Sequence, residues 1–406
     1  MNRQIAKLFS IAQQETRTIL GLMSGTSLDG LDLALCKISG FGTRTSLKLV
    51  RFKTKEYTSS FRASILRVFA QEQIQQADLS GLNALIADTH AEMVLSTLKS
   101  WGIRPDQIDL IASHGQTVYH APQSLSQSEL YPNNTLQIGD GDHLAVKTGI
   151  ITLSDFRQKH VAAGGEGAPL ALYGDYLLYS DPTENRILLN LGGIANFTFL
   201  PSRSAFTAGH TAFATDVGPA NTLMNQFMQK HFGQDMDKNA EIAQSGTVLP
   251  ALLHALLDHS FFQDKIPKTT GPELFNLHYL GEAINRSGIE EPTPNDIMAT
   301  LCAFSAHGIG QSIRETIQNL PNHNPTRILG SGGGISNPLL MKLIKESISE
   351  LNLKLETFDA LGLDPDAKEA ALFAVLANES IAGSPEYVKG LFRAPAVCMG
   401  KISLPE

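Results

Sequence analysis

Short apolar runs alternate with longer segments of helical spacing along the first part of the chain. The runs predict buried strands because they are short and bounded by turn residues. They lie at residues 19–23, 31–36, 47–51 and 108–113. Apolar residues at helical spacing predict helices at residues 61–69 and 77–101. The first part of the chain is therefore predicted to be a mixed α/β domain.

The same opening pattern recurs in the second half of the chain. A predicted strand at residues 186–191 runs into a turn with Gly192 and Gly193, and a strand returns at residues 197–200. Further helices are predicted at residues 220–231, 248–258, 296–318 and 367–379, with a strand at residues 327–330. Two related α/β lobes facing one cleft are the simplest architecture for this repeat.

The length of the chain agrees with two lobes. A chain of 406 residues exceeds the size at which a single hydrophobic core continues to grow. We place the first lobe at residues 1–160 and the second at residues 161–390. The C-terminal segment, residues 391–406, is predicted to return to the first lobe.

Composition and charge narrow the class of protein. The chain is 42% hydrophobic and 18% charged, as expected for a globular protein. Its formal net charge of −8 argues against nucleic acid or an anionic membrane as the main partner. Cys36, Cys302 and Cys398 are too scattered for a metal site or a disulfide framework. Without a signal-peptide pattern or a long apolar run, we expect a soluble, cytoplasmic protein.

A glycine-rich hairpin spanning residues 21–32 is the first candidate binding element. It joins two strands and lacks the lysine of the common phosphate loop. Its small residues would admit phosphate oxygens, and its amides and hydroxyls would donate hydrogen bonds to them. The candidates are Gly25, Thr26, Ser27, Leu28, Asp29, Gly30, Leu31 and Asp32. Asp29 or Asp32 would hold a hydrated Mg²⁺ ion. The alternative is an ordinary hairpin whose glycines serve only the turn.

Two further glycine turns resemble nucleotide-binding elements. Gly192 and Gly193 allow close approach of a ligand, although glycine pairs also make plain hairpins. Gly332, Gly333 and Gly334 follow a predicted strand and would leave a flat surface for a purine, the alternative being a flexible connection. Together the three turns predict a nucleotide between the lobes. They do not match the dinucleotide fingerprint.

Polar residues after predicted strands are candidates for binding a second ligand. His114 and Thr117 lie in a segment predicted to follow the strand at residues 108–113, where binding loops gather, and Gln116 lies between them. For His114 the alternative is a structural hydrogen bond between loops. Gln137 is a weaker candidate of the same kind. Arg157 would pair with Asp155 or bind a substrate carboxylate.

Two carboxylates are candidates for chemistry. Asp216 precedes Gly218 and Pro219, which would end a strand and begin a helix whose amides face the site. A carboxylate there would take a proton from water, unless it is a helix cap or a magnesium ligand. Glu369 begins a predicted helix, where a negative charge is favourable in any case.

Several motifs, in order along the chain, resemble those of the anhydro-N-acetylmuramic acid kinase family. The match runs from about Ile19 to the C-terminal region. It includes the hairpin at residues 21–30, Ser-His-Gly-Gln-Thr at 113–117, Asp-Phe-Arg at 155–157, and residues 165–170, 190–196, 216–221 and 332–334. The resemblance implies the two-lobed actin-like, ribonuclease-H-like ATPase fold with an interlobe active-site cleft. It also implies ATP and Mg²⁺ as cofactors and a bacterial role in recycling cell-wall sugar.

The resemblance also implies a reaction and residue roles. Asp216 would activate water, which attacks the anomeric carbon of the 1,6-anhydro sugar, and the freed 6-oxygen would accept the γ-phosphoryl group of ATP. Arg157 would bind the lactyl carboxylate, and Glu369 would position the sugar. His160 and Glu166 stand where many members carry Asp and Gln; His160 would titrate near neutral pH and Glu166 would add a charge.

The sequence is also compatible with two other functions. One is a kinase of another anhydro sugar such as levoglucosan, which lacks the lactyl and acetamido groups. The other is a nucleotide-gated binding protein of the same fold without sugar chemistry. The expected partners are the anhydro sugar and ATP, with no nucleic acid or membrane, and a homodimer is a candidate assembly.

Overall fold

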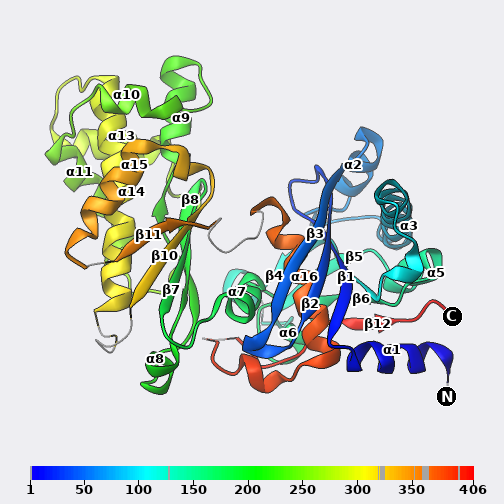
Figure 1. Cartoon of the computed structure of the whole chain (residues 1–406). Coiled ribbons are helices and arrows are strands. Elements are labelled where there is room, and N and C mark those ends of the chain that lie inside the picture. The colour runs from blue at the N-terminus through cyan, green and yellow to red at the C-terminus, as the bar shows by residue number, and fades with distance from the viewer. Residues whose placement is uncertain are drawn as a thin grey trace. The chain divides into compact units, whose positions relative to one another are not determined.

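The computed structural model divides the chain into two compact units (Figure 1). The structure describes residues 2–126, 129–318, 320, 325–351, 353–358, 365–391 and 394–406. Unit 1 comprises Met1–Tyr179 and Asp366–Glu406, and unit 2 comprises Ser180–Pro365. In the described residues, no helix combines the length and the apolar character needed to cross a membrane.

Unit 1 is built on a mixed sheet of seven strands within the part of the chain that the structure describes. The order is β12-β6-β4-β1-β2-β3, and β5 pairs with β4. Strand β1 is antiparallel to β2 and parallel to β4. The strands are β1 Thr16–Ser24, β2 Gly30–Ser39, β3 Ser46–Glu56, β4 Leu110–Ala121, β5 Asn134–Ile138, β6 Thr152–Ser154 and β12 Lys401–Ser403.

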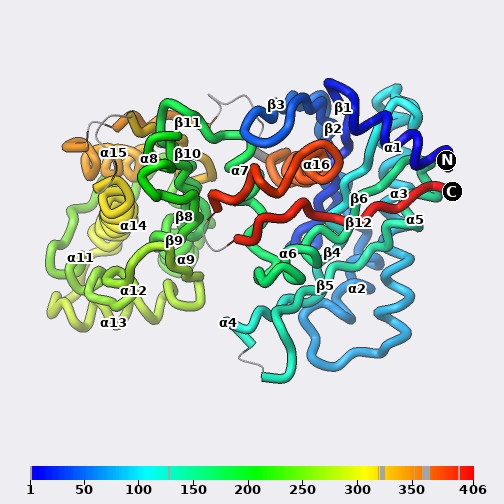
Figure 2. The backbone as a smooth tube through the Cα atoms, turned by 90° about the horizontal axis from the view of Figure 1, so that it is seen from below, coloured from blue at the N-terminus to red at the C-terminus, as the bar shows by residue number. Residues whose placement is uncertain are grey.

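Helices cover both faces of this sheet. Leu20 and Leu22 of β1 share a core with Val94 of α3 and Leu144 of α5. Because side chains alternate along a strand, Gly21 faces the opposite side, where α16 lies against β1. Figure 2 follows the C-terminal segment back alongside β6 in this unit. The helices are α1 Arg3–Gln13, α2 Ser59–Leu66, α3 Gln76–Trp101, α4 Gln123–Ser126, α5 Gly141–Thr148, α6 Phe156–Ala162, α7 Ala171–Tyr179 and α16 Lys368–Ala382.

Unit 2 repeats the strand arrangement of unit 1. Its sheet has the order β11-β10-β7-β8-β9 in the described residues, with β7, β8 and β9 antiparallel and β10 and β11 parallel to β7. The strands are β7 Asn185–Leu191, β8 Ile194–Leu200, β9 Phe213–Pro219, β10 Thr326–Ser331 and β11 Lys354–Thr357. The helices are α8 Arg203–Thr207, α9 Thr222–Phe232, α10 Glu241–Gln244, α11 Pro250–Leu257, α12 Ser260–Gln263, α13 Leu277–Ser287, α14 Pro294–Ile317 and α15 Pro338–Ser347.

These elements confirm the predicted α/β class and the repeated opening. The hairpin of β1 and β2 in unit 1 corresponds to that of β7 and β8 in unit 2, and in each unit a parallel strand joins the first strand of the hairpin. One prediction was wrong. Residues 113–117 do not follow a strand but lie inside β4, which continues to Ala121. Gly115, with φ of 72°, lets the strand bend there and pair onward with β5.

The two units divide the chain at different residues from those expected. Residues 161–179 and 366–390 lie in unit 1 rather than in the second lobe. The reason is the packing of α7 and α16. A Cβ atom on Gly174 of α7 would lie 2.3 Å from Leu372 of α16, and one on Gly21 of β1 would lie 1.9 Å from the carbonyl oxygen of Ala370. Both helices are therefore packed tightly into the core of unit 1.

Candidate functional site

The predicted phosphate hairpin is an exposed turn between β1 and β2 in unit 1. Thr26, Ser27 and Asp29 are exposed, and the Ser27 hydroxyl donates to Asp29 Oδ1 at 2.8 Å. The Leu28 amide donates to Gly25 O at 3.4 Å. The hydroxyls and the carboxylate at the tip are thus accessible to a ligand.

The residues of the hairpin have different structural roles. The side chain of Leu28 lies in the core with Ile65, and that of Leu31 in the core of the sheet, so only their main chains are available to a ligand. A Cβ on Gly30 would lie 2.4 Å from Lys55 O, so this glycine is required by sheet packing. At Gly25 the nearest atom would be 3.6 Å away. Packing therefore does not demand a glycine at position 25, and the space beside it is open.

Acidic groups gather beside the hairpin. Thr54 Oγ1 donates to Asp32 Oδ1 at 2.5 Å. Partial burial raises the pKa of Asp32, and the negative charges of Asp29 and Asp366 raise it further. In the described residues no group of three or more His, Cys, Asp or Glu side chains forms a metal cage. Mg²⁺ needs none, because it binds through one or two carboxylates together with waters and substrate phosphates. The carboxylates of Asp29 and Asp32, which are close enough to interact electrostatically, fit that requirement.

The segment at residues 113–117 contacts the hairpin directly. His114 Nδ1 lies 3.3 Å from Ser24 O. The Ser24 hydroxyl donates to Gln116 Oε1 at 2.6 Å, and Gln116 Nε2 donates to Gly25 O at 3.1 Å. These contacts follow from the parallel pairing of β1 with β4, in which Ser24 is the partner of Gln116. His114 and Gln116 are both buried.

A buried hydrogen-bond chain supports this junction from behind. Tyr57 Oη donates to Ser24 Oγ at 2.8 Å and lies 2.7 Å from His90 Nε2. Burial lowers the pKa of His90 to about 4, so its ring is neutral near pH 7. Neither Tyr57 nor His90 was predicted from sequence, because each lies in an unremarkable stretch with no motif around it.

Arg157 is held in place without forming an ion pair. Its Nε donates to His114 Nε2 at 3.1 Å and its Nη1 donates to Gly167 O at 2.7 Å. Asp155, the partner expected as one alternative, instead pairs with Lys401. Across the described part of the chain, no carboxylate pairs with the half-buried guanidinium of Arg157 and no group accepts from its Nη2. This arrangement suits an anionic ligand.

The other candidates for sugar binding lie in the same unit. Gln137 Nε2 donates to Thr117 Oγ1 at 3.1 Å, whereas Gln137 Oε1 is buried without a partner in the described residues. Glu369 is exposed in the first turn of α16. Desolvation and the charge of Asp32 raise its pKa, whereas Arg157 lowers it. Glu369 therefore lies within electrostatic range of both the hairpin and the guanidinium.

His160 is a buried structural residue and not the group titrating near neutral pH that its residue type suggested. It is buried, and its Nδ1 accepts from the Gly167 amide at 2.9 Å. Burial and the charge of Arg157 lower its pKa to about 4, so the expected titration near neutral pH is wrong. Glu166 is exposed. His160 thus fixes the position of Gly167, whose carbonyl accepts from Arg157.

In unit 2 the second and third glycine turns lie side by side. Strands β7 and β10 are parallel neighbours, with Ser331 opposite Asn190. A Cβ on Gly332, whose φ is 86°, would lie 2.6 Å from Asn190 Oδ1, and one on Gly334 would lie 2.7 Å from Leu191 Cβ. Gly333 has nothing within 4 Å and is open. Both turns occupy the carboxyl end of the sheet, where ligands bind in open α/β sheets.

The first turn of α9 is anchored at this same edge. Asn221 Nδ2 donates to Gly192 O at 2.7 Å, and the amides of Ala220 and Thr222 donate to Gly193 O at 2.9 and 3.0 Å. Asn337 caps α15, because its Oδ1 accepts from the Leu340 amide at 2.9 Å.

Asp216 lies in β9 beside these turns. It is paired with Asn196 of β8 and does not cap α9, whose N-cap is Asn221. Its Oδ2 accepts from the Thr270 amide at 2.9 Å. Burial raises the pKa of Asp216, the hydrogen bond from Thr270 lowers it, and the charge of Glu273 raises it. A half-buried carboxylate with a raised pKa suits a general base.

Glu273 is expected to shift the acid limb of the pH profile, which the ionisation of Asp216 sets. Its carboxylate folds over Gly271, on which a Cβ would lie 2.2 Å from Glu273 Oε2. Removing this negative charge favours the ionised form of Asp216 and lowers its pKa. A base works when deprotonated, so the acid limb of kcat against pH should move to lower pH in Glu273→Gln. Glu290→Gln, which removes an exposed carboxylate, is the control and should leave the limb unchanged. An acid limb that stays at the same pH in Glu273→Gln would contradict the role of Asp216 as the general base.

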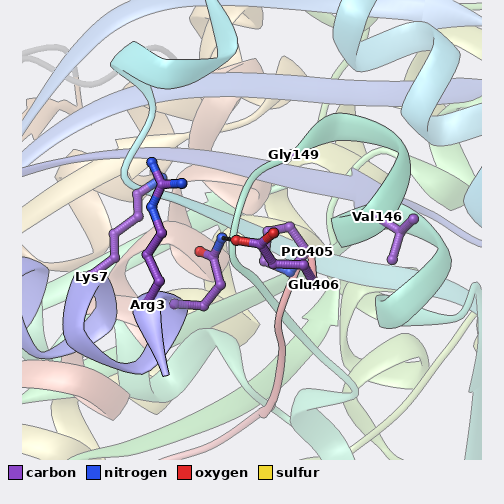
Figure 3. Close-up of a pocket in the computed structure, with 7 residues that line it drawn as sticks. Arg3, Lys7, Val146, Gly149, Pro405 and Glu406 are labelled. Atoms are coloured by element: carbon purple, nitrogen blue, oxygen red, sulfur yellow. Dashed lines mark hydrogen bonds between the residues drawn. The ribbon is translucent and has the colours of Figure 1, made fainter. Parts of the chain in front are cut away.

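A separate hollow lies near the two ends of the chain in unit 1 (Figure 3). It has a volume of about 580 Å³ and is formed by α1, the end of α5 and the C-terminal residues. Arg3 and Lys7 line it, and Gln4 Nε2 donates to Glu406 Oε1 at 2.7 Å. None of the predicted site residues contributes to this hollow.

Known proteins resemble the chain over its whole length. The family model for anhydro-N-acetylmuramic acid kinase matches residues 17–400. A protein of that name from Pseudoalteromonas atlantica is 48% identical, covering 100% of both chains. One from Caldanaerobacter subterraneus is 36% identical over 98% of this chain and 100% of its own. Among solved structures, a gluconate kinase from Lactobacillus acidophilus aligns over 96% of this chain and 94% of its own, at 11% identity and a TM-score of 0.46.

Proposed function

Because the chain belongs to the anhydro-N-acetylmuramic acid kinase family, we propose that it uses ATP to convert 1,6-anhydro-N-acetylmuramic acid into N-acetylmuramic acid 6-phosphate and ADP. Water adds to the anomeric carbon and the internal ether opens. The freed 6-oxygen takes the γ-phosphoryl group. The product is a sugar recovered from the cell wall, and the reaction is that of a cytoplasmic sugar kinase.

The guanidinium of Arg157 is the observation that favours this sugar. Two of its nitrogens are occupied by His114 and Gly167, whereas Nη2 has no partner among the described residues. A half-buried cation that interacts with Glu369 only at a distance, and forms no ion pair in the described residues, favours a ligand that brings a carboxylate. The lactyl group of muramic acid is such a carboxylate, and levoglucosan has none.

Asp216 is the residue assigned to water activation. Its carboxylate is oriented by the Thr270 amide and has no cationic partner in the described residues, so it remains available to accept a proton. Transfer of that proton to the carboxylate makes the water a stronger nucleophile toward the anomeric carbon. The glycine turns of residues 192–193 and 332–334 are assigned to the nucleotide, because Gly193, Gly332 and Gly333 are exposed at the carboxyl end of the sheet.

The hairpin of unit 1 is assigned to the phosphates. The exposed hydroxyl of Thr26, and that of Ser27 once it leaves Asp29, would donate hydrogen bonds to the phosphates. Asp29, with Asp32 beside it, would hold Mg²⁺ through its waters. The ion supplies charge neutralisation of the transferring phosphoryl group when bound.

We also propose a homodimer as the assembly state of the protein.

Product analysis in labelled water tests the reaction. The anhydro sugar is incubated with ATP and Mg²⁺ in H₂¹⁸O, and the products are analysed by mass spectrometry. We expect one ¹⁸O at the anomeric position and a phosphate on the 6-oxygen. The anomeric oxygen of the product exchanges slowly with water and gains label without turnover. Product incubated in H₂¹⁸O for the same time is therefore the control. Phosphorylation without labelling above this control would contradict hydrolytic opening.

Levoglucosan is the comparison substrate. With Arg157 unpaired in the free protein, we expect kcat/KM to be about 10- to 100-fold higher for the muramic sugar, the size of one or two charge-assisted hydrogen bonds. A preference for levoglucosan would overturn the assignment of the substrate while leaving the kinase assignment intact.

A further inference from the structure

His114 has no nitrogen left for a ligand. Its ring is buried, and Phe373 of α16 packs against it with ring centroids 4.8 Å apart. Nδ1 faces Ser24 O, which can only accept, so Nδ1 carries the proton. Nε2 is then the acceptor for the N–H of Arg157 Nε. Burial and the charge of Arg157 lower the pKa of His114 to about 3, in agreement with a neutral ring.

The ring therefore connects two binding elements of unit 1. On one side is the main chain of Ser24, where the phosphate hairpin leaves β1. On the other side is the guanidinium of Arg157 in α6. A protonated ring would lose the acceptor at Nε2, and the opposite tautomer would set a lone pair against Ser24 O. Only one tautomer satisfies both contacts.

Gln116, two residues after His114 in β4, makes a second connection to the hairpin. Its amide accepts from Ser24 Oγ and donates to Gly25 O and Thr117 O. His114 and Gln116 thus both bind the main chain or side chain of Ser24 and Gly25 from neighbouring positions of one strand. The second connection is independent of Arg157, so it provides a comparison for the first.

We propose that His114 is a positioning residue that links the carboxylate-binding guanidinium of Arg157 to the phosphate hairpin at Ser24, rather than a residue that binds the sugar. The inference rests on the proposed function, which assigns a substrate carboxylate to Arg157 and phosphates to the hairpin. Each ring nitrogen contacts the binding element of one substrate. Mutation can therefore separate the effects of the two contacts on the binding of the two substrates.

Asparagine and glutamine separate the two contacts. The amide nitrogen of asparagine lies near the position of Nδ1, so His114→Asn keeps the contact with Ser24 O and loses that with Arg157. The amide oxygen of glutamine lies near the position of Nε2, so His114→Gln keeps the acceptor for Arg157 and loses the contact with Ser24 O. Both are uncharged and smaller than or similar to the original ring.

The Michaelis constants of the two substrates are the main readout. In His114→Asn we expect KM for the sugar to rise about tenfold while KM for ATP-Mg²⁺ stays within about twofold of its original value. In His114→Gln we expect the reverse pattern. A residue with a merely structural role would change both constants together in both variants, and that result would overturn the proposal. A sugar-binding role would raise KM for the sugar in both.

Nitrogen NMR of the unmodified protein tests the same point without mutation. With labelled histidine and arginine, a coupling across the N–H···N hydrogen bond identifies the His114 ring by its contact with Arg157 Nε. We expect a pyridine-like Nε2 and a protonated Nδ1. The opposite tautomer, or no such coupling, would overturn the proposal even if both variants fail to fold. Failure of the labelled-water experiment on the original protein would instead refute the proposed function.

Discussion

Asp216→Asn should lower kcat by about 1,000-fold, within the range for removal of a general base. The amide cannot take the proton from water, so about 4 kcal/mol of transition-state stabilisation is lost. The asparagine oxygen still accepts from the Thr270 amide, so the fold of β9 and the KM values for both substrates should change little. Steady-state kinetics with both substrates varied measures this effect.

A melting curve and a second variant are the controls for this result. The free energy of unfolding should stay close to that of the original protein, because the side chains are nearly the same size. Thr270→Ala keeps the backbone amide that binds Asp216 and should retain most activity. Full phosphorylating activity in Asp216→Asn would show that the base lies elsewhere.

Gly21→Ala should cost the fold roughly 3 kcal/mol, at the upper end of the usual range for overpacking. The added methyl would lie 1.9 Å from Ala370 O and 2.9 Å from its carbonyl carbon. Those atoms belong to the backbone of α16, so no side-chain rotation relieves the clash and the helix has to shift away from β1. Denaturant unfolding followed by circular dichroism measures the loss.

Gly25→Ala is the matched control for Gly21→Ala. Both glycines belong to the predicted hairpin, but a Cβ at position 25 meets nothing closer than 3.6 Å. We therefore expect the stability of Gly25→Ala to stay within about 0.5 kcal/mol of the original value. Equal stability of all three proteins would contradict the tight packing of α16 on β1.

The strands and the two related units were predictable because short apolar runs are a local property of the sequence. Residues 186–191 and 327–330 each carry a short apolar run, and both form largely buried strands. The residues at which the chain divides into two units could not be predicted in the same way. Helix α16 packs in unit 1 because its backbone fits against Gly21, a contact between residues far apart in sequence.

The candidate site was predictable where motifs supplied the residues and less so where burial decided their roles. Gly25 and Gly21 look alike in the sequence, yet one leaves open space and the other is required for packing. His114 was a candidate ligand for the sugar, but both its nitrogens are satisfied by Ser24 and Arg157. Hydrogen-bond partners that lie on three different elements leave no periodic signal along the chain.

The same limitation applies to the residues that were missed. Thr270 and Glu273 act on Asp216 from a segment that follows β9 by some distance in the chain. Tyr57, which directly follows β3, donates to Ser24, and His90 of α3 contacts Tyr57. A buried tyrosine or histidine beside apolar neighbours is usually a core residue, so composition alone does not single out either one.

The hydrogen bonds from His90 to Gln116 run in one direction only. Tyr57 donates to Ser24 and Ser24 donates to Gln116, so His90 Nε2–H must donate to Tyr57. Reversing this polarity would rotate the amide of Gln116 and bring its oxygen against the carbonyl oxygens of Gly25 and Thr117. The carbonyl of Gly25 is thereby held toward the buried amide of Gln116. In the proposed phosphate site, the Gly25 peptide is thus oriented by Gln116 before any ligand binds.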